Sequence, residues 1–121
     1  MNSKYDITFP ANLLKSRIGH ALTDLNLNEF YNAFKYLKSV IVEIFENKDD
    51  SKECIKNSIK NISLTHGSSE QTIMTGIHNI YDKCNKELLK EEIPKGRIKL
   101  NYLERIRIVA NYVITRINYE N

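Results

Sequence analysis

The side chains with the clearest chemical potential fall between residues 68 and 86, where amide, hydroxyl and imidazole groups recur at helical spacing. If this segment is a helix, one of its faces presents Gln71, Thr75, His78, Asn79 and Asp82. Asparagine and glutamine can read adenine in the major groove of DNA, and threonine can contact the thymine methyl group. This face therefore fits base recognition, and a solvated helix surface is the alternative.

Basic and hydroxyl side chains near that face are candidates for contacts with phosphate, which fix register on DNA but carry no sequence information. A stretch from Lys95 to Arg107 fits either a phosphate-binding surface or a solvated helix face. The net charge of +3 permits a polyanionic partner and does not require one. We expect phosphate contacts from Lys56, Lys60, Ser68, Ser69, Lys83, Lys86, Arg97 and Lys99.

Nothing in the sequence suggests an enzyme. No nucleophile is paired with a base, no glycine-rich loop follows a strand, and no pair of carboxylates lies in an apolar context. His20, His66 and His78 do not combine with the two cysteines in a metal-ligand spacing, so we expect neither a metal nor a cofactor. Cys84 is expected to pack on an apolar face.

The size and composition of the chain suit one globular domain, with 121 residues of which 41% are hydrophobic and 27% charged. A domain of this size can fold without metals or disulfides. No apolar run approaches the roughly 20 residues that span a bilayer, and the N-terminus has no signal-peptide pattern. We therefore expect a cytoplasmic protein with reduced thiols, no membrane association and no small-molecule substrate.

Apolar spacing in the N-terminal half predicts two helices after an N-terminal tail at 1–10. The first is expected at 11–24, where leucine and isoleucine recur at three- and four-residue intervals. Asn28 should cap the second, because its carboxamide can accept a free backbone N–H. The apolar stripe of this second helix begins at Phe30 and continues to Phe45.

Two further helical segments follow on either side of the proposed reading face. Ser51 should cap a stretch that ends near Leu64 and forms one helix or two short ones. A last helix is expected at 101–118, after a polar connection that contains Pro94 and Gly96. Its inward side chains should be Ile106, Val109, Ala110, Val113 and Ile117.

The clearest break between helices lies at Gly67, where a glycine interrupts the chain and serines restart it. Ser68 and Gln71 form a capping-box pattern, in which each side chain satisfies a backbone N–H at the new helix start. We therefore expect an all-α fold, a compact single-domain bundle of about five to six helices over 11–121, with a helix-turn-helix at about 52–85. The buried face of its second helix should consist of Ile73, Ile77, Ile80 and Cys84.

Three short motifs occur in a fixed order, from Tyr36 to Ile41, from Ile44 to Asn47, and from Ser68 to Ile73. Their order and unbroken spacing up to Cys84 resemble the C-terminal DNA-binding effector domain of the master response regulator of endospore formation. Residues 59–63 stand in the place of that family's Tyr-Pro-x-Ile-Ala helix. Residues 100–117 resemble its closing helix, reached here by a shorter connection.

The resemblance implies a six-helix domain that places its recognition helix in the major groove of double-stranded DNA and binds tandem sites as a head-to-tail pair. The family's base-reading positions fall at Met74, Thr75, His78 and Asn79, where the family has Glu, Arg, Arg and His. Because arginine reads guanine, its loss implies a more A·T-rich target. The full set of expected base contacts is Gln71, Thr72, Met74, Thr75, His78 and Asn79.

The function we expect is therefore transcriptional regulation without a receiver domain, because 121 residues leave no room for the phosphate-accepting domain of the family. Activity would then be set by abundance, by a protein partner, or by competition for related sites. The alternative is a helical protein-interaction module or inhibitor, bacterial or phage, that keeps the fold without binding DNA. The missing arginines favour this alternative. Met74 fits either the edge of the core or an apolar base contact.

Overall fold

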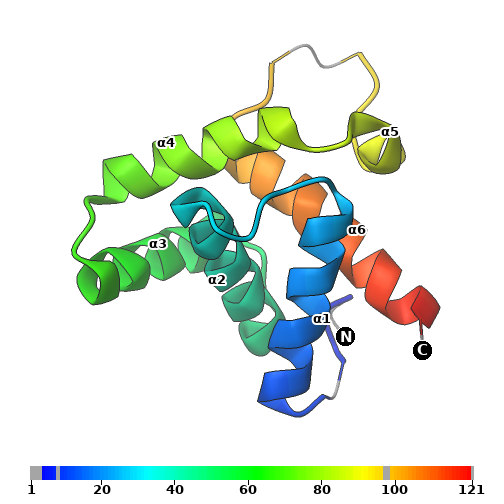
Figure 1. The fold of residues 1–121 in the computed structure, drawn as a ribbon, viewed down its shortest axis with the longest axis horizontal. Helices are drawn as coiled ribbons and strands as arrows, with labels where there is room; N and C mark the ends of the chain where they lie inside the picture. The colour runs from blue at the N-terminus through cyan, green and yellow to red at the C-terminus, as the bar shows by residue number, and fades with distance from the viewer. Residues whose placement is uncertain (1–3, 8, 97–98, 121) are drawn as a thin grey trace.

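The computed structural model describes residues 4–7, 9–96 and 99–120, and every regular element in these ranges is helical (Figure 1). This confirms the all-α expectation. None of the described helices is long and apolar enough to cross a membrane. The elements are α1 (Ala11–Asp24), α2 (Asn32–Asn47), α3 (Lys52–His66), α4 (Glu70–Ile80), the 3-10 turn η1 (Tyr81–Lys83), α5 (Lys86–Leu89) and α6 (Tyr102–Glu120).

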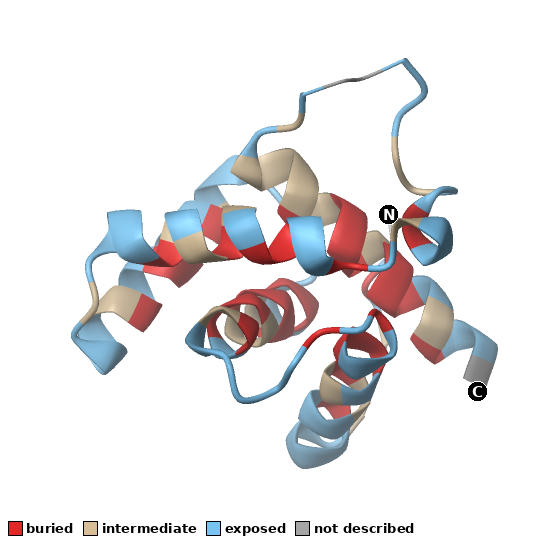
Figure 2. Cartoon of the chain, turned by 45° about the horizontal axis from the view of Figure 1, so that its top comes forward, coloured by how far each residue is buried: buried red, intermediate tan, exposed pale blue. Residues whose placement is uncertain are grey.

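The helix α2 forms the centre of the bundle, where it packs against α1, α3, α4 and α6. α4 lies across the bundle beside α3, and α6 passes behind α4 towards α1 (Figure 1). Each helix turns its buried side inward and its exposed side to solvent (Figure 2). Leu37 and Ile41 of α2, at 1% and 0% exposure, therefore belong to one core with side chains from all the long helices.

The start of α2 differs from the sequence expectation, although α1 has its predicted limits. Asn28 does not cap α2: its Oδ1 accepts the backbone N–H of Phe30 at 2.9 Å and closes a local turn instead. The helix begins at Asn32, with Tyr31 at the N-cap and no side-chain cap. Phe30 therefore precedes the helix and is 79% exposed, so its expected place in the core stripe was wrong.

Both ends of α3 are set by local backbone geometry. Ser51 caps it as expected, since its hydroxyl accepts the N–H of Cys54 at 3.2 Å. The segment forms one continuous helix and not two short ones, and its far end is closed by Gly67 in the left-handed conformation. Leu64 lies on the outer side of this helix and is 77% exposed.

Within the described residues before α1, Tyr5 is buried and Ile7 and Phe9 pack against the core. Tyr5 is 1% exposed, and its ring lies 5.2 Å from that of Phe45. Its hydroxyl donates to Asp50 at 3.0 Å and lies 3.3 Å from Oδ1 of Asn111 in α6. Burial, followed by the charge of Asp50, raises the pKa of Tyr5, so the hydroxyl stays a donor at neutral pH.

The closing helix α6 supplies one wall of the core. Asn101 and Glu104 cap its start reciprocally, because each side chain accepts the backbone N–H of the other, at 2.8 and 3.1 Å. The helix begins one residue later and ends two residues later than 101–118. All the side chains predicted to face inward are buried, namely Ile106, Val109, Ala110, Val113 and Ile117.

Candidate nucleic-acid interface

The connection between α3 and α4 consists of Gly67, Ser68 and Ser69. Gly67 has a φ of 71°, a conformation that favours glycine, and its N–H donates to the carbonyl of Ser63 at 3.0 Å. The cap of α4 is Ser69, whose hydroxyl accepts the N–H of Thr72 at 3.0 Å. The predicted capping box between Ser68 and Gln71 was therefore wrong, because the helix starts one residue later.

Ser68 serves a different purpose, since it fastens the turn to the bundle. Its hydroxyl shares a 3.0 Å hydrogen bond with that of Tyr36 in α2, and its carbonyl accepts the hydroxyl of Ser63 at 2.5 Å. The ring of Tyr36 also meets His66 edge-on, with centroids 6.0 Å apart. Ser68 is half-buried, and its hydroxyl is already engaged rather than free for a phosphate.

The two sides of α4 differ sharply in burial. Ile73, Ile77 and Ile80 are 0%, 1% and 2% exposed, which confirms the predicted apolar face. Cys84 is buried as expected but lies beyond the helix, which ends at Ile80. The opposite side exposes Gln71, Thr75 and Asn79, and the amide of Gln71 donates to the hydroxyl of Thr75 at 3.1 Å.

The remaining candidates for base contacts lie at the margins of this exposed side. Met74 and His78 are half-buried, and Met74 packs against the edge of the core. Thr72 is exposed, but its Oγ1 accepts the hydroxyl of Ser69 at 2.8 Å and so belongs to the cap. The structure therefore brings the six predicted base contacts onto one helix, and three of them, Gln71, Thr75 and Asn79, are exposed on its outer face.

Arg105 of α6 holds the far end of α4. Its Nη1 donates to the carbonyl of His78 at 2.7 Å and to Asp82 at 3.1 Å, and its side chain is only 15% exposed. Nε of Arg107 donates to the carbonyl of Asp50 at 2.9 Å. Both arginines of the basic stretch therefore hydrogen-bond to backbone carbonyls outside α6 and help to hold the fold together.

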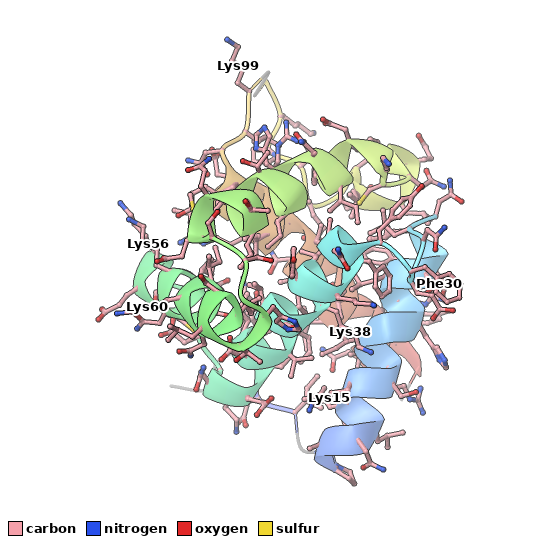
Figure 3. All side chains as sticks on the ribbon, turned by 60° about the vertical axis from the view of Figure 1, so that its left-hand side comes forward. Lys15, Phe30, Lys38, Lys56, Lys60 and Lys99 are labelled. Atoms are coloured by element: carbon pink, nitrogen blue, oxygen red, sulfur yellow. The ribbon has the colours of Figure 1, made fainter. Side chains whose placement is uncertain are left out.

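The predicted phosphate contacts have different environments. Lys56 and Lys60 are exposed on α3, and Lys99 extends away from the helical body (Figure 3). Lys83 is exposed and lies 4.5 Å from the ring centroid of Tyr31. Arg97 lies outside the described residues.

Lys86 does not lie on α4, because α4 ends at Ile80 and Lys86 begins α5. Its Nζ donates to the carbonyls of Tyr81 at 2.6 Å and Cys84 at 3.1 Å, and it stands 4.6 Å from the Tyr81 ring centroid. Arg105 lies 4.7 Å from the same centroid. Lys86 therefore stabilises the turn after α4, and its ammonium group is already coordinated by backbone oxygens.

Comparison with known protein families, curated proteins and solved structures found no match. The likeness to the sporulation effector domain therefore rests on the motifs and their spacing alone.

Lys52 is a basic residue that the sequence interpretation missed. It is exposed at the first position of α3, and with Lys56 and Lys60 it forms a row at intervals of four residues, here called the lysine row. None of the three lysines has an ion-pair partner among the residues that the structure describes. The four-residue spacing was the signal that could have identified Lys52.

The two thiols show no sign of reactivity. Cys54 and Cys84 are free, and burial raises the pKa of both, that of Cys84 to about 11. The neutral thiol is therefore the dominant form at physiological pH. Within the described ranges, no group of histidine, cysteine and carboxylate side chains could hold a metal ion.

Proposed function

We propose that this chain binds double-stranded DNA through the exposed side of α4 and acts as a transcriptional regulator. The observation that carries the proposal is the division of α4 into a fully buried isoleucine face and an opposite face of amide and hydroxyl groups. A helix with side chains is about 10–12 Å across, which fits the roughly 12 Å width of the major groove. Asn79 and Gln71 are the residues we assign to adenine edges, and Thr75 to a thymine methyl.

The rigid mounting of α4 supports this assignment. Its start is held by the Ser69 cap and by the bond between Ser68 and Tyr36, and its end is held by Arg105. A helix fixed at both ends loses little conformational entropy when it binds, which favours affinity and a defined register. The α3 and α4 pair, joined by a three-residue turn, fits the helix-turn-helix type of DNA reader.

The lysines beside α4 also favour a nucleic-acid partner, and one carboxylate there acts against it. The lysine row of α3 is unpaired among the described residues, whereas Asp82 is paired with Arg105. Glu70 at the start of α4 is exposed, and its negative charge opposes the approach of phosphate.

The assembly we propose is a protein that is monomeric when free and pairs head to tail on tandem DNA sites.

The decisive experiment selects a preferred duplex from a random pool and then titrates the protein with that duplex and with a scrambled one at several salt concentrations. Asn79→Ala should cost about 1–3 kcal/mol on the selected duplex only, because a bidentate base contact discriminates by that amount. Lys60→Ala should weaken both duplexes alike and flatten the salt dependence by about one unit.

A matched control is Asn12→Ala, which removes an exposed asparagine from α1 and should leave both affinities unchanged. If the wild-type protein binds neither duplex with a steep salt dependence, DNA binding is wrong for this chain. If Asn79→Ala lowers both affinities equally, α4 does not read bases.

A groove of about 570 Å³ between α1, α2 and α3 favours a second candidate function, a protein-interaction module. Phe34, Val42 and Ile62 line it and are only 4%, 6% and 5% exposed, so its floor is apolar. Lysines and glutamates of opposite charge surround that floor. Failure of salt-dependent DNA binding would leave this candidate as the better one.

A further inference from the structure

Tyr102, at the start of α6, stands between two hollows beside the exposed face of α4. Tyr102 and Met74 line both hollows. The smaller one, about 240 Å³, also contains Gln71, Thr75 and His78 from α4. The larger one, about 470 Å³, opens towards α3. Besides Met74 and Tyr102, its lining includes Lys52, Lys56 and Glu70.

The side chain of Tyr102 is fixed at one end and free at the other. Its ring is half-buried and packs against the core, and burial raises its pKa, so the hydroxyl carries its proton at neutral pH. Within the described part of the chain, that hydroxyl has no hydrogen-bond partner. A tyrosine held in this way can donate a hydrogen bond to a ligand at little entropic cost.

Two members of the lysine row face the same hollow. Lys52 and Lys56 both line it, are exposed, and have no ion-pair partner in the described ranges. Among the described residues that line the hollow, Glu70 is the one carboxylate beside the two lysines, so their summed charge is positive. The row from Lys52 to Lys60 extends about 12 Å along α3, at 1.5 Å per residue. Positive charge along a hollow beside the reading face complements a phosphodiester backbone.

We propose that Tyr102, Lys52 and Lys56 hold the sugar-phosphate backbone of one DNA strand in the hollow between α3 and the start of α6. The hydroxyl of Tyr102 donates a hydrogen bond to a phosphate oxygen, and the lysines neutralise the neighbouring charge. This strand anchor rests on the proposed function and adds to it a contact from outside the two-helix unit. It fixes the register of α4 and contributes no base specificity.

The test compares Tyr102→Phe with the wild-type protein on the selected and scrambled duplexes. The substitution keeps the ring and removes one neutral hydrogen bond, so both duplexes should bind about 2- to 10-fold more weakly. The salt dependence should stay unchanged, because a neutral hydroxyl releases no counterion. Tyr119→Phe is the matched control: Tyr119 lies near the other end of α6, is 89% exposed, and should behave as wild type.

Lys52→Gln gives a second and independent readout. Because Lys52 is exposed, the substitution should leave the fold intact. This variant should weaken both duplexes and flatten the salt dependence by about one unit. Lys15→Gln on α1 is its control, because Lys15 does not line this hollow and lies away from Lys56 in Figure 3, and it should change neither quantity.

The outcomes separate the anchor from the proposed function. The anchor alone is overturned if the wild-type protein binds DNA and Tyr102→Phe binds both duplexes as tightly as the wild type does. It is also overturned if Tyr102→Phe loses affinity for the selected duplex only. If Lys52→Gln has the affinity and the salt dependence of the wild-type protein, Lys52 does not contact the phosphate backbone, and the site as stated is overturned. Absence of salt-dependent binding in the wild type overturns both proposals together.

Discussion

Replacing Ser69 with alanine should loosen the start of α4 by a predictable amount. The substitution removes the hydroxyl that accepts the N–H of Thr72 at 3.0 Å. N-cap losses cost about 0.5–2 kcal/mol, and because Ser69 is exposed, water can replace part of the lost bond. We therefore expect a loss of about 1 kcal/mol in the free energy of unfolding. For 121 residues the unfolding entropy is about 0.25 kcal/mol/K, so Tm should fall by about 4 °C.

Urea and thermal unfolding followed by circular dichroism measure this loss, and Ser69→Asp should restore most of it, because aspartate is also a good N-cap. Gln71→Ala should be close to neutral, since Gln71 bonds to Thr75 and not to the backbone.

A double-mutant cycle distinguishes the two adjacent serines. Tyr36→Phe and Ser68→Ala remove the same 3.0 Å bond, so together they should show a coupling energy of about 1 kcal/mol. Tyr36→Phe combined with Ser69→Ala should be additive. The reasoning is refuted if Gln71→Ala costs as much as Ser69→Ala, or if Tyr36 couples to Ser69 and not to Ser68.

Two further predictions concern the support of α4. Cys84 has its pKa raised to about 11, so the folded state keeps its proton above the ordinary thiol pKa, and stability should fall as pH rises from about 9 to 11. The loss, relative to Cys84→Ala over the same range, should reach about 2 kcal/mol in urea titrations, and a flat difference would contradict it. Arg105→Met should cost about 2–3 kcal/mol, because it removes charge-assisted bonds to His78 and Asp82. Arg105→Lys should recover only part of this loss, since lysine lacks the guanidinium fork.

Apolar periodicity was sufficient to predict the existence of the long helices and most of their buried sides, although it wrongly placed Phe30 in the stripe of α2. The limits of α1, the inward side chains of α6 and the isoleucines of α4 all follow from three- and four-residue spacing. This spacing predicts buried faces well because residues three and four apart lie on the same side of a helix, which is the side that packs against the core. Helix starts were harder to predict, because several residues near each start can cap. Ser68 and Ser69 are equally able to do so, and the choice between them depends on Tyr36, which is 32 positions from Ser68 in the chain.

The contacts of each basic side chain could not be predicted from its position in the sequence alone. Arg105 and Lys86 looked like surface cations, yet both bind backbone carbonyls that become available only when α4 and η1 end where they do. Lys52 could have been identified from its four-residue spacing to Lys56, but that it lines one hollow with Tyr102, 50 positions later, is visible only in the fold. Local pattern identifies charge, but tertiary contacts decide whether that charge remains free.

The contact between Tyr5 and Asn111 joins residues 106 positions apart, near the two ends of the described chain. α6 also supplies Ile106, Val109 and Val113 to the core, so no earlier part of the polypeptide can complete that core by itself. On a ribosome, a nascent chain that ends before α6 leaves the apolar sides of α2 and α4 uncovered. We therefore expect folding to be completed only after α6 has emerged, with chaperones binding the unfinished chain until then.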